Sequence, residues 1–139
     1  MKLILTTNDV RPMLERIKKS GQVVPVWFWT LTPTEIAHYY NGVGSDLTWK
    51  PLRVALSWIF RWAKRSVVIH DVMWTYIERF ELTEDDFYIS NECLKVNARI
   101  ELNELGMSKW NPLYWYRYRN AWMAQKACDN LGKTAWNSK

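Results

Sequence analysis

The apolar positions of this chain are irregular in the first third and follow helical spacing in the rest. Within residues 8–20, four apolar residues recur at i, i+3, i+4 and i+7, which predicts a helix that begins near Asn8-Asp9 and ends at Gly21. These residues are Val10, Met13, Leu14 and Ile17. Residues 22–32 are rich in Val, Trp, Phe and Thr and predict a strand, and residues 1–6 alternate weakly and predict a second, short one.

Residues 32–41 carry two conflicting patterns. Thr32-Pro33-Thr34-Glu35 has the form of a capping box with proline at the first helical position, which favours a short helix. Ile36, His38 and Tyr40 alternate with polar neighbours, which favours a strand. Both interpretations stay open at the level of sequence.

The remaining pattern is helical after a loop at residues 41–46. Helices are predicted at about 51–65, 66–79, 83–105 and 112–132, the second of them apolar nearly all round and therefore central. The prediction is one α+β domain over residues 1–139, with a mainly helical body of about four to five helices and a small N-terminal β-sheet. Its parts are a mixed β/α part at 1–42, the helical body at 51–132 and a loose tail at 133–139.

Composition agrees with a small globular domain. The chain has 139 residues, of which 48% are hydrophobic, and no apolar run reaches the roughly 18–20 residues of a membrane span. The first residues do not form a signal peptide, and two isolated cysteines indicate a reduced compartment. Ten tryptophans and seven tyrosines are more than such a core needs, so some should be exposed.

Charge is distributed in blocks. Residues 50–70 carry five bases and no acid, residues 71–104 nine acids and three bases, and residues 105–139 six bases and one acid. Such blocks can complement one another across a fold, or they can face nucleic acid or an acidic partner.

The clearest candidate for chemistry is His70-Asp71, which interrupts an apolar run of helical length. Burying an ionisable pair is costly unless the partners satisfy one another. Asp71 could orient His70 as a general base, or both could ligate a metal with Asp46. With two histidines in the chain a His-rich zinc site is excluded, and a hard ion such as Mg²⁺ is the alternative. Further possible ligands are Asp85, Asp86 and His38. The structural interpretation is that the pair ties the central helix to the loop at 42–46.

The segment 110–122 interleaves aromatic residues with arginines, a pattern found in cores, in protein-binding surfaces and in nucleic-acid interfaces. On a helix Tyr114, Tyr118 and Trp122 share one face. Another face holds Leu113, Tyr116 or Arg117, Asn120, and Met123 or Ala124. Because only one face can be fully buried, an exposed aromatic stripe is expected. The candidate binding residues are Tyr114, Trp115, Arg117, Tyr118, Arg119 and Trp122, together with the basic residues Arg53, Arg61 and Lys64 of the 51–65 segment.

Two short motifs lie about twenty residues apart. The first reads Ser45-Asp46-Leu47-Thr48-Trp49-Lys50-Pro51 and the second His70-Asp71-Val72-Met73-Trp74. They resemble the Thr-Asp-x-x-Ser-x-Pro and His-Asp-x-x-Tyr motifs of a phage-encoded family of unknown function. In that family an acidic helix start and a Tyr/Arg-rich last helix follow. Trp49 and Trp74 stand where the family has Ser and Tyr. The resemblance implies a phage origin, a β-containing N-terminal part and convergence of Asp46 with His70-Asp71.

These observations predict a small phage-encoded soluble protein that acts by binding another phage or host protein. It would be a virion or tail-associated component or an inhibitor of a host factor, located in the host cytoplasm or the virion, with a structural His-Asp cluster and no cofactor. One alternative is a metal-assisted hydrolase that uses Asp46, His70 and Asp71. A second is a nucleic-acid-binding protein that uses the basic faces of the 51–65 and 112–130 helices.

Overall fold

A computed structural model describes residues 6–41, 59, 61–79 and 83–137 of the chain. Over these residues every regular element is a helix and there is no strand, so the predicted α+β class with an N-terminal sheet is wrong. The elements are α1 (Thr7–Ser20), the 3₁₀ helix η1 (Val26–Thr30), α2 (Pro33–Asn41), α4 (Lys64–Arg79), α5 (Glu84–Glu104) and α6 (Pro112–Asn137).

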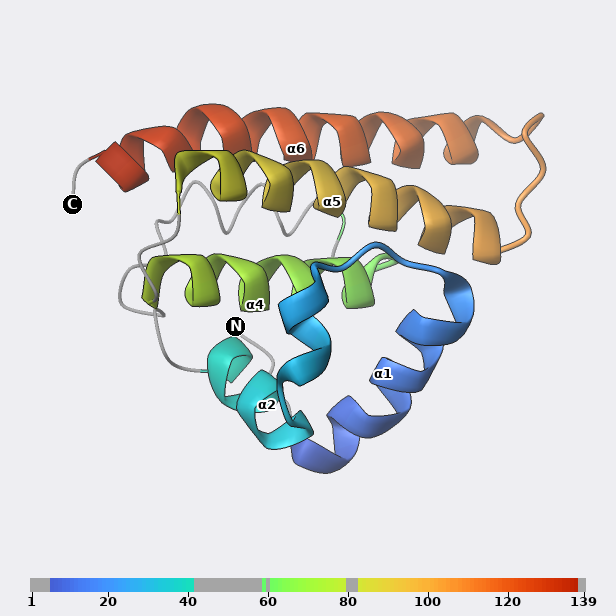
Figure 1. Cartoon of the computed structure of the whole chain (residues 1–139). Helices are drawn as coiled ribbons and strands as arrows, with labels where there is room; N and C mark the ends of the chain where they lie inside the picture. The colour runs from blue at the N-terminus through green and yellow to red at the C-terminus, as the bar shows by residue number, and fades with distance from the viewer. Residues whose placement is uncertain (1–5, 42–58, 60, 80–82, 138–139) are drawn as a thin grey trace.

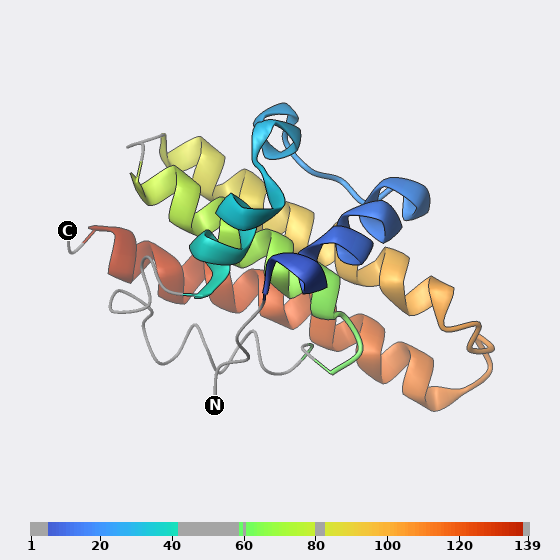
Figure 2. The ribbon, with the colours of Figure 1, turned by 90° about the horizontal axis from the view of Figure 1, so that it is seen from below.

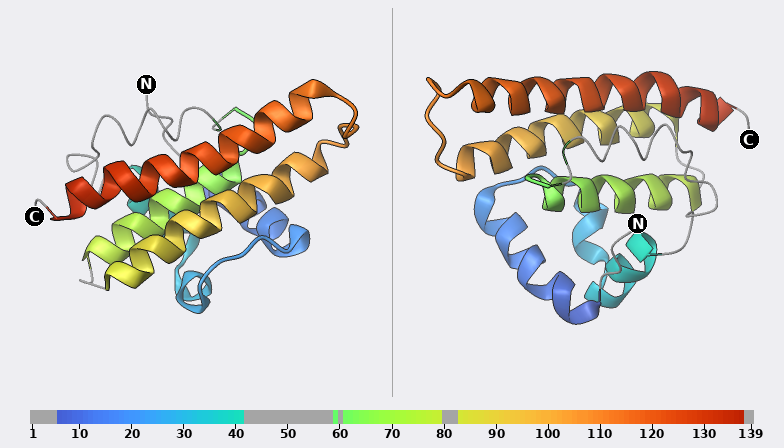
Figure 3. Two further views of the ribbon diagram at one scale, coloured as in Figure 1. Left: turned by 90° about the horizontal axis from the view of Figure 1, so that it is seen from above. Right: turned by 180° about the vertical axis from the view of Figure 1, so that it is seen from behind.

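The three long helices lie side by side, and each runs opposite to the one before it (Figure 1). Helix α4 packs on α5 and α5 packs on α6, while α1 packs on α2 and α2 on α4. Seen from below, α1 and α2 cover the face of α4 that α5 and α6 leave open (Figure 2). Seen from above and from behind, α6 lies along the outer side of the molecule (Figure 3).

Helix α4 is central, as its apolar pattern predicts. Ile69, Val72 and Met73 belong to a core shared with α1, η1 and α2. Val67 belongs to a second core, in which α5 and α6 contribute mainly small residues such as Ala98 and Ala121. Small side chains at these positions let the three long helices approach closely, so α4 is buried on both sides.

The segment predicted to be a strand at residues 22–32 instead contains η1. Pro25 precedes it, and the amide of Phe28 donates to the Pro25 carbonyl at 3.0 Å to form a local turn. Phe28 is buried, and Trp27 stacks on Tyr76 of α4 with ring centroids 3.8 Å apart. The aromatic residues that raised the strand propensity therefore pack against helices, and among the described residues there is no strand for this segment to pair with. The other strand was predicted at residues 1–6, and residues 1–5 lie outside the described part of the chain.

The two patterns at residues 32–41 are resolved in favour of the helix. The Glu35 amide donates to Thr32 Oγ1 at 3.1 Å, and the Thr32 amide donates to Glu35 Oε1 at 2.9 Å. This capping box begins α2 at Pro33. Helix α1 begins in the same way, with Thr6 as its cap and Asp9 at the third position, two residues before the predicted start at Asn8.

The helical body keeps most of its predicted boundaries. The predicted helix at 51–65 lies mostly outside the described residues; its end is a turn, and α4 begins at Lys64. Helix α5 begins after the predicted cap Thr83. Helix α6 continues through Gly132 to Asn137, where a loose tail was expected. None of the helices in the described part is long and apolar enough to cross a membrane.

Candidate functional site

His70 is part of a buried polar chain that joins the three long helices. The imidazole is 1% exposed, and its Nε2 lies 2.7 Å from Asn91 Oδ1 on α5. The Asn91 side-chain amide in turn donates to Asp129 Oδ1 on α6 at 2.9 Å. We call His70, Asn91 and Asp129 the polar relay. The His70 side chain therefore bonds to Asn91, 21 positions away in the sequence, and is linked through Asn91 to Asp129.

The relay shows which ring nitrogen of His70 carries a proton. A carboxylate can only accept, so the Asn91 amide nitrogen faces Asp129 and its Oδ1 faces His70. His70 Nε2 therefore carries the proton, and Nδ1 is a buried lone pair with no hydrogen-bond partner among the described residues. Burial lowers the pKa of His70 to about 4, although the bond to Asn91 opposes this. At neutral pH the imidazole is uncharged and closed to solvent.

The other predicted members of the His-Asp cluster lie elsewhere or outside the described part. Asp71 is half-buried, and its negative charge adds to burial in raising the pKa of Tyr40 to about 12. Asp46 lies outside the described residues, so its convergence with His70-Asp71 stays a prediction.

The further candidate metal ligands are dispersed. Asp86 accepts from the Thr83 amide at 3.0 Å as a helix cap, while His38 and Asp85 are exposed. Within the described ranges no three His, Cys, Asp or Glu side chains are grouped in a way that could hold a metal ion.

Helix α6 presents an exposed face of aromatic and cationic side chains. Trp115 and Trp122 are 51% and 47% exposed, and Arg119 and Lys126 are exposed between and beyond them. At about 100° per residue these four positions fall within roughly 60° of one another around the helix. We call Trp115, Arg119, Trp122 and Lys126 the α6 face.

The expected aromatic stripe is thus present, but with different members. Tyr114 is buried, and its hydroxyl donates to Asn103 Oδ1 at 2.9 Å. Tyr118 is half-buried beneath Arg99, whose guanidinium carbon lies 3.9 Å from the ring centroid. The buried face of α6 therefore includes Tyr114, Ala121 and Ala124, and it turns Trp115 and Trp122 outward.

Local contacts hold the exposed rings in place. Trp115 Nε1 donates to the Lys109 carbonyl at 2.6 Å, and the Trp115 ring packs against Tyr118 with centroids 5.5 Å apart. Lys126 Nζ lies 5.9 Å from the Trp122 ring centroid. Rings ordered in the free protein lose less conformational entropy when they bind.

The predicted basic residues that the structure describes lie on different elements and differ in burial. Arg117 is half-buried, with its guanidinium 6.0 Å from the Trp62 ring and one nitrogen 3.6 Å from Met107 Sδ. Arg119, two residues on, points about 200° away around α6. Arg61 and Lys64 are exposed at the start of α4, and Arg53 lies outside the described residues.

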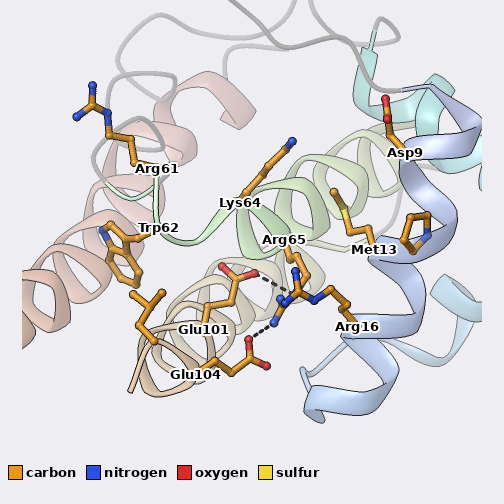
Figure 4. Close-up of a pocket in the computed structure, with 11 residues that line it drawn as sticks. Asp9, Met13, Arg16, Arg61, Trp62, Lys64, Arg65, Glu101 and Glu104 are labelled. Atoms are coloured by element: carbon orange, nitrogen blue, oxygen red, sulfur yellow. Dashed lines mark hydrogen bonds and ion pairs between the residues drawn. The ribbon is translucent and has the colours of Figure 1, made fainter. Parts of the chain in front are cut away.

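A cleft that sequence analysis missed lies between α1, the start of α4 and the end of α5 (Figure 4). Its volume is about 410 Å³, and Glu101 lines it although this side chain is only 5% exposed. Burial raises the pKa of Glu101 to about 7, against the opposing positive charge of Arg65. Arg65 Nε lies 3.2 Å from Glu101 Oε1 but donates to Gln22 Oε1 at 2.8 Å. By this geometry neither Glu101 oxygen accepts a hydrogen bond.

Comparison with known proteins gives no family for this chain. No protein-family model, curated protein or solved structure matches it. The structure therefore defines a helical protein with a buried polar relay, an exposed aromatic face and a cleft, and its function has to be argued from these.

Proposed function

We propose that this protein acts by binding an acidic surface of another protein through the α6 face. The observation that carries the proposal is the pair Trp115 and Trp122, each about half exposed on one side of a well-packed helix. Trp, Tyr and Arg are the residues most enriched among the energetically dominant positions of protein interfaces. Tyr116 and Trp110, which are exposed beside this face, extend the available aromatic area.

Charge indicates the chemistry of the partner. The stretch 105–139 carries six bases and one acid, and that acid, Asp129, is bonded to Asn91. Arg119 and Lys126 therefore stand on the α6 face without a carboxylate beside them in sequence. A partner that offers Asp or Glu side chains around apolar pockets would complement both kinds of group.

A nucleic-acid partner is less well supported by the same residues. Tight non-specific binding to DNA usually involves several phosphate contacts, and two cations would give only a weak dependence on salt. Arg99 and Arg117, which could have added to them, are used against Tyr118 and Trp62. A role in a phage virion or against a host factor remains part of this proposal.

The hydrolase alternative loses its central residue. His70 is neutral, buried among three helices and bonded to Asn91, so a substrate could not reach it without opening the core. We assign His70 to packing specificity, because its buried bond to Asn91 forms in only one register of α4 against α5.

The test compares two tryptophan variants as bait in a bacterial host lysate. W115A/W122A removes the α6 face, and W29A removes a tryptophan of similar exposure on η1 as a matched control. We expect a protein retained by wild type and W29A to be lost with W115A/W122A. The purified partner should then bind W115A/W122A at least tenfold more weakly. Equal binding to all three baits would contradict the proposal, as would retention of nucleic acid in place of a protein.

A further inference from the structure

Helix α5 carries an acidic and apolar surface whose spacing matches that of the α6 face. Its members are two exposed acids, an isoleucine that is 50% exposed and a half-buried valine: Asp85, Glu92, Ile89 and Val96. Like the residues of the α6 face, they recur at i, i+4, i+7 and i+11. At about 100° per residue they fall within roughly 60° of one another around the helix. We call these four residues the α5 stripe.

Both surfaces hold charges that are not ion-paired among the described residues. Asp85 has no basic residue within four positions in the sequence. Within the described ranges, Glu92 makes no ion pair with Lys95, three residues on, or with Lys126 on the adjacent helix α6; the ion pairs of α5 there join Arg65 to residues on another side of the helix. On the α6 face Arg119 contacts a methionine sulfur and Lys126 an indole ring. An acidic partner for one surface and a basic partner for the other would neutralise these charges.

The two surfaces complement each other when the helices run antiparallel. In that register Asp85 lies opposite Lys126, Ile89 opposite Trp122, Glu92 opposite Arg119, and Val96 opposite Trp115. Each acid therefore meets a base, and each aliphatic side chain meets an indole. If the same residues were aligned in parallel, the acids would meet indoles and the bases would meet aliphatic side chains. The pattern of charges thus selects one direction of approach.

One chain cannot bring its own two surfaces together in this register. Helices α5 and α6 already pack against each other, in opposite directions, through other faces (Figure 3). Arg99 packs over Tyr118 in this hairpin, so within one chain Glu92 and Arg119 are offset by roughly 9 Å along the helix axes. The complementary register is available only between two molecules.

We propose that the α6 face docks the α5 stripe of a second copy of this chain. The inference rests on the proposed role of the α6 face as a docking surface, and it names a second copy as its partner. The two surfaces differ, so each pair of copies keeps one α5 stripe and one α6 face free, and association can continue beyond a dimer. The contact extends about 16 Å along each helix, which is small for a protein interface, so the association is weak.

The test is sedimentation equilibrium of the full chain at low salt, from micromolar to near-millimolar protein. The weight-average mass of wild type should rise with concentration, and salt should reduce the rise because the paired charges are exposed. W115A/W122A should stay monomeric, and W29A should behave as wild type. E15K reverses an exposed charge on α1, outside both surfaces, and should also behave as wild type.

Charge reversal at one predicted pair identifies the surfaces that meet. E92K and R119E each place like charges opposite one another between identical copies, so each alone should associate at least about tenfold more weakly than wild type. A mixture of the two variants should associate again, because unlike copies restore opposite charges. The double variant E92K/R119E should self-associate about as strongly as wild type. Circular dichroism checks that each variant is folded.

The outcomes separate this proposal from that for the α6 face. Association that each single reversal weakens and that both the mixture and the double variant restore supports docking of the α5 stripe. A monomer at every concentration would overturn it and would leave capture of another protein by the α6 face to the lysate experiment. Association that E92K leaves unchanged would also overturn it, because the α5 stripe would then not be the surface that is bound.

Discussion

The two buried ionisable groups, His70 and Glu101, should make opposite contributions to the pH dependence of stability. The folded protein holds the pKa of His70 at about 4, below its ordinary value of 6.5. As pH falls through this window the unfolded chain takes up a proton that the folded protein excludes, so stability is lost. At 1.36 kcal/mol per pKa unit the loss is roughly 3 kcal/mol between pH 6.5 and 4.

Glu101 works in the other direction. Its pKa is raised from 4.5 to about 7, so between these values the folded protein binds a proton that the unfolded chain does not. Stability therefore rises as pH falls, by roughly 3 kcal/mol in total. Between pH 6.5 and 4.5 unfolding adds one proton at His70 and releases one at Glu101. The two effects cancel, so together these groups should cause almost no change of stability with pH.

Single substitutions should expose each half of this balance. E101Q leaves only the His70 contribution. As the pH is lowered from 6.5 to 4.5, the free energy of unfolding of E101Q should fall by about 1.4 kcal/mol per pH unit relative to that of wild type. H70Q leaves only the Glu101 contribution, so over the same fall in pH its free energy of unfolding should rise by a similar amount relative to wild type. The assay is urea unfolding followed by tryptophan fluorescence at pH 7, 6 and 5.

The control and the refutation follow from the same experiment. E92Q removes an exposed carboxylate from α5 and should run parallel to wild type. The other titrating groups are common to all variants and cancel in the differences. If the stability of E101Q and H70Q changes with pH in parallel with that of wild type, neither group is buried in the folded protein.

Three further predictions concern the relay, a helix end and the thiols. N91A leaves the His70 Nε2 donor without an acceptor and should cost about 2–3 kcal/mol in urea unfolding; a cost near zero would mean that water replaces the amide. G21A places a side chain on a residue with a φ of 75° and open space around it. It should therefore cost only about 1 kcal/mol of backbone strain. A loss of melting temperature larger than this strain explains would indicate a steric clash. Cys93 and Cys128 are buried, and burial raises the pKa of the Cys128 thiol. Both thiols should react with a thiol reagent in denaturant, and neither should react in the folded protein. Rapid reaction without denaturant would contradict this packing.

Local sequence chemistry predicted the elements whose signals are local. Thr83 and Asp86, three residues apart, predicted the start of α5, whereas the Thr32-Glu35 capping box favoured a helix at α2 without excluding a strand. The strand prediction at residues 22–32 failed because aromatic and β-branched residues suit any half-buried surface, and here the surface is a set of helices. Only the tertiary arrangement decides whether such a segment pairs in a sheet or packs against helices.

The buried polar groups depended on the same tertiary information. Asn91 lies 21 residues after His70, and nothing local in the sequence pairs them. Glu101 could have been noticed, because it continues the buried positions Leu94 and Ala98 at helical spacing along α5. An acid on the apolar side of a helix is a sequence signal for a buried charge.

The most direct test of the α6 face as a protein-docking surface is site-specific photo-crosslinking. A benzophenone amino acid would replace Trp122 in one variant and Trp29 in another, and each would be irradiated in a bacterial host lysate. We predict one discrete protein adduct from position 122, which disappears when Trp115 is also changed to Ala and weakens at high salt, and no such adduct from position 29. Equal adducts from both positions, or an adduct at 122 that W115A leaves unchanged, would contradict the account.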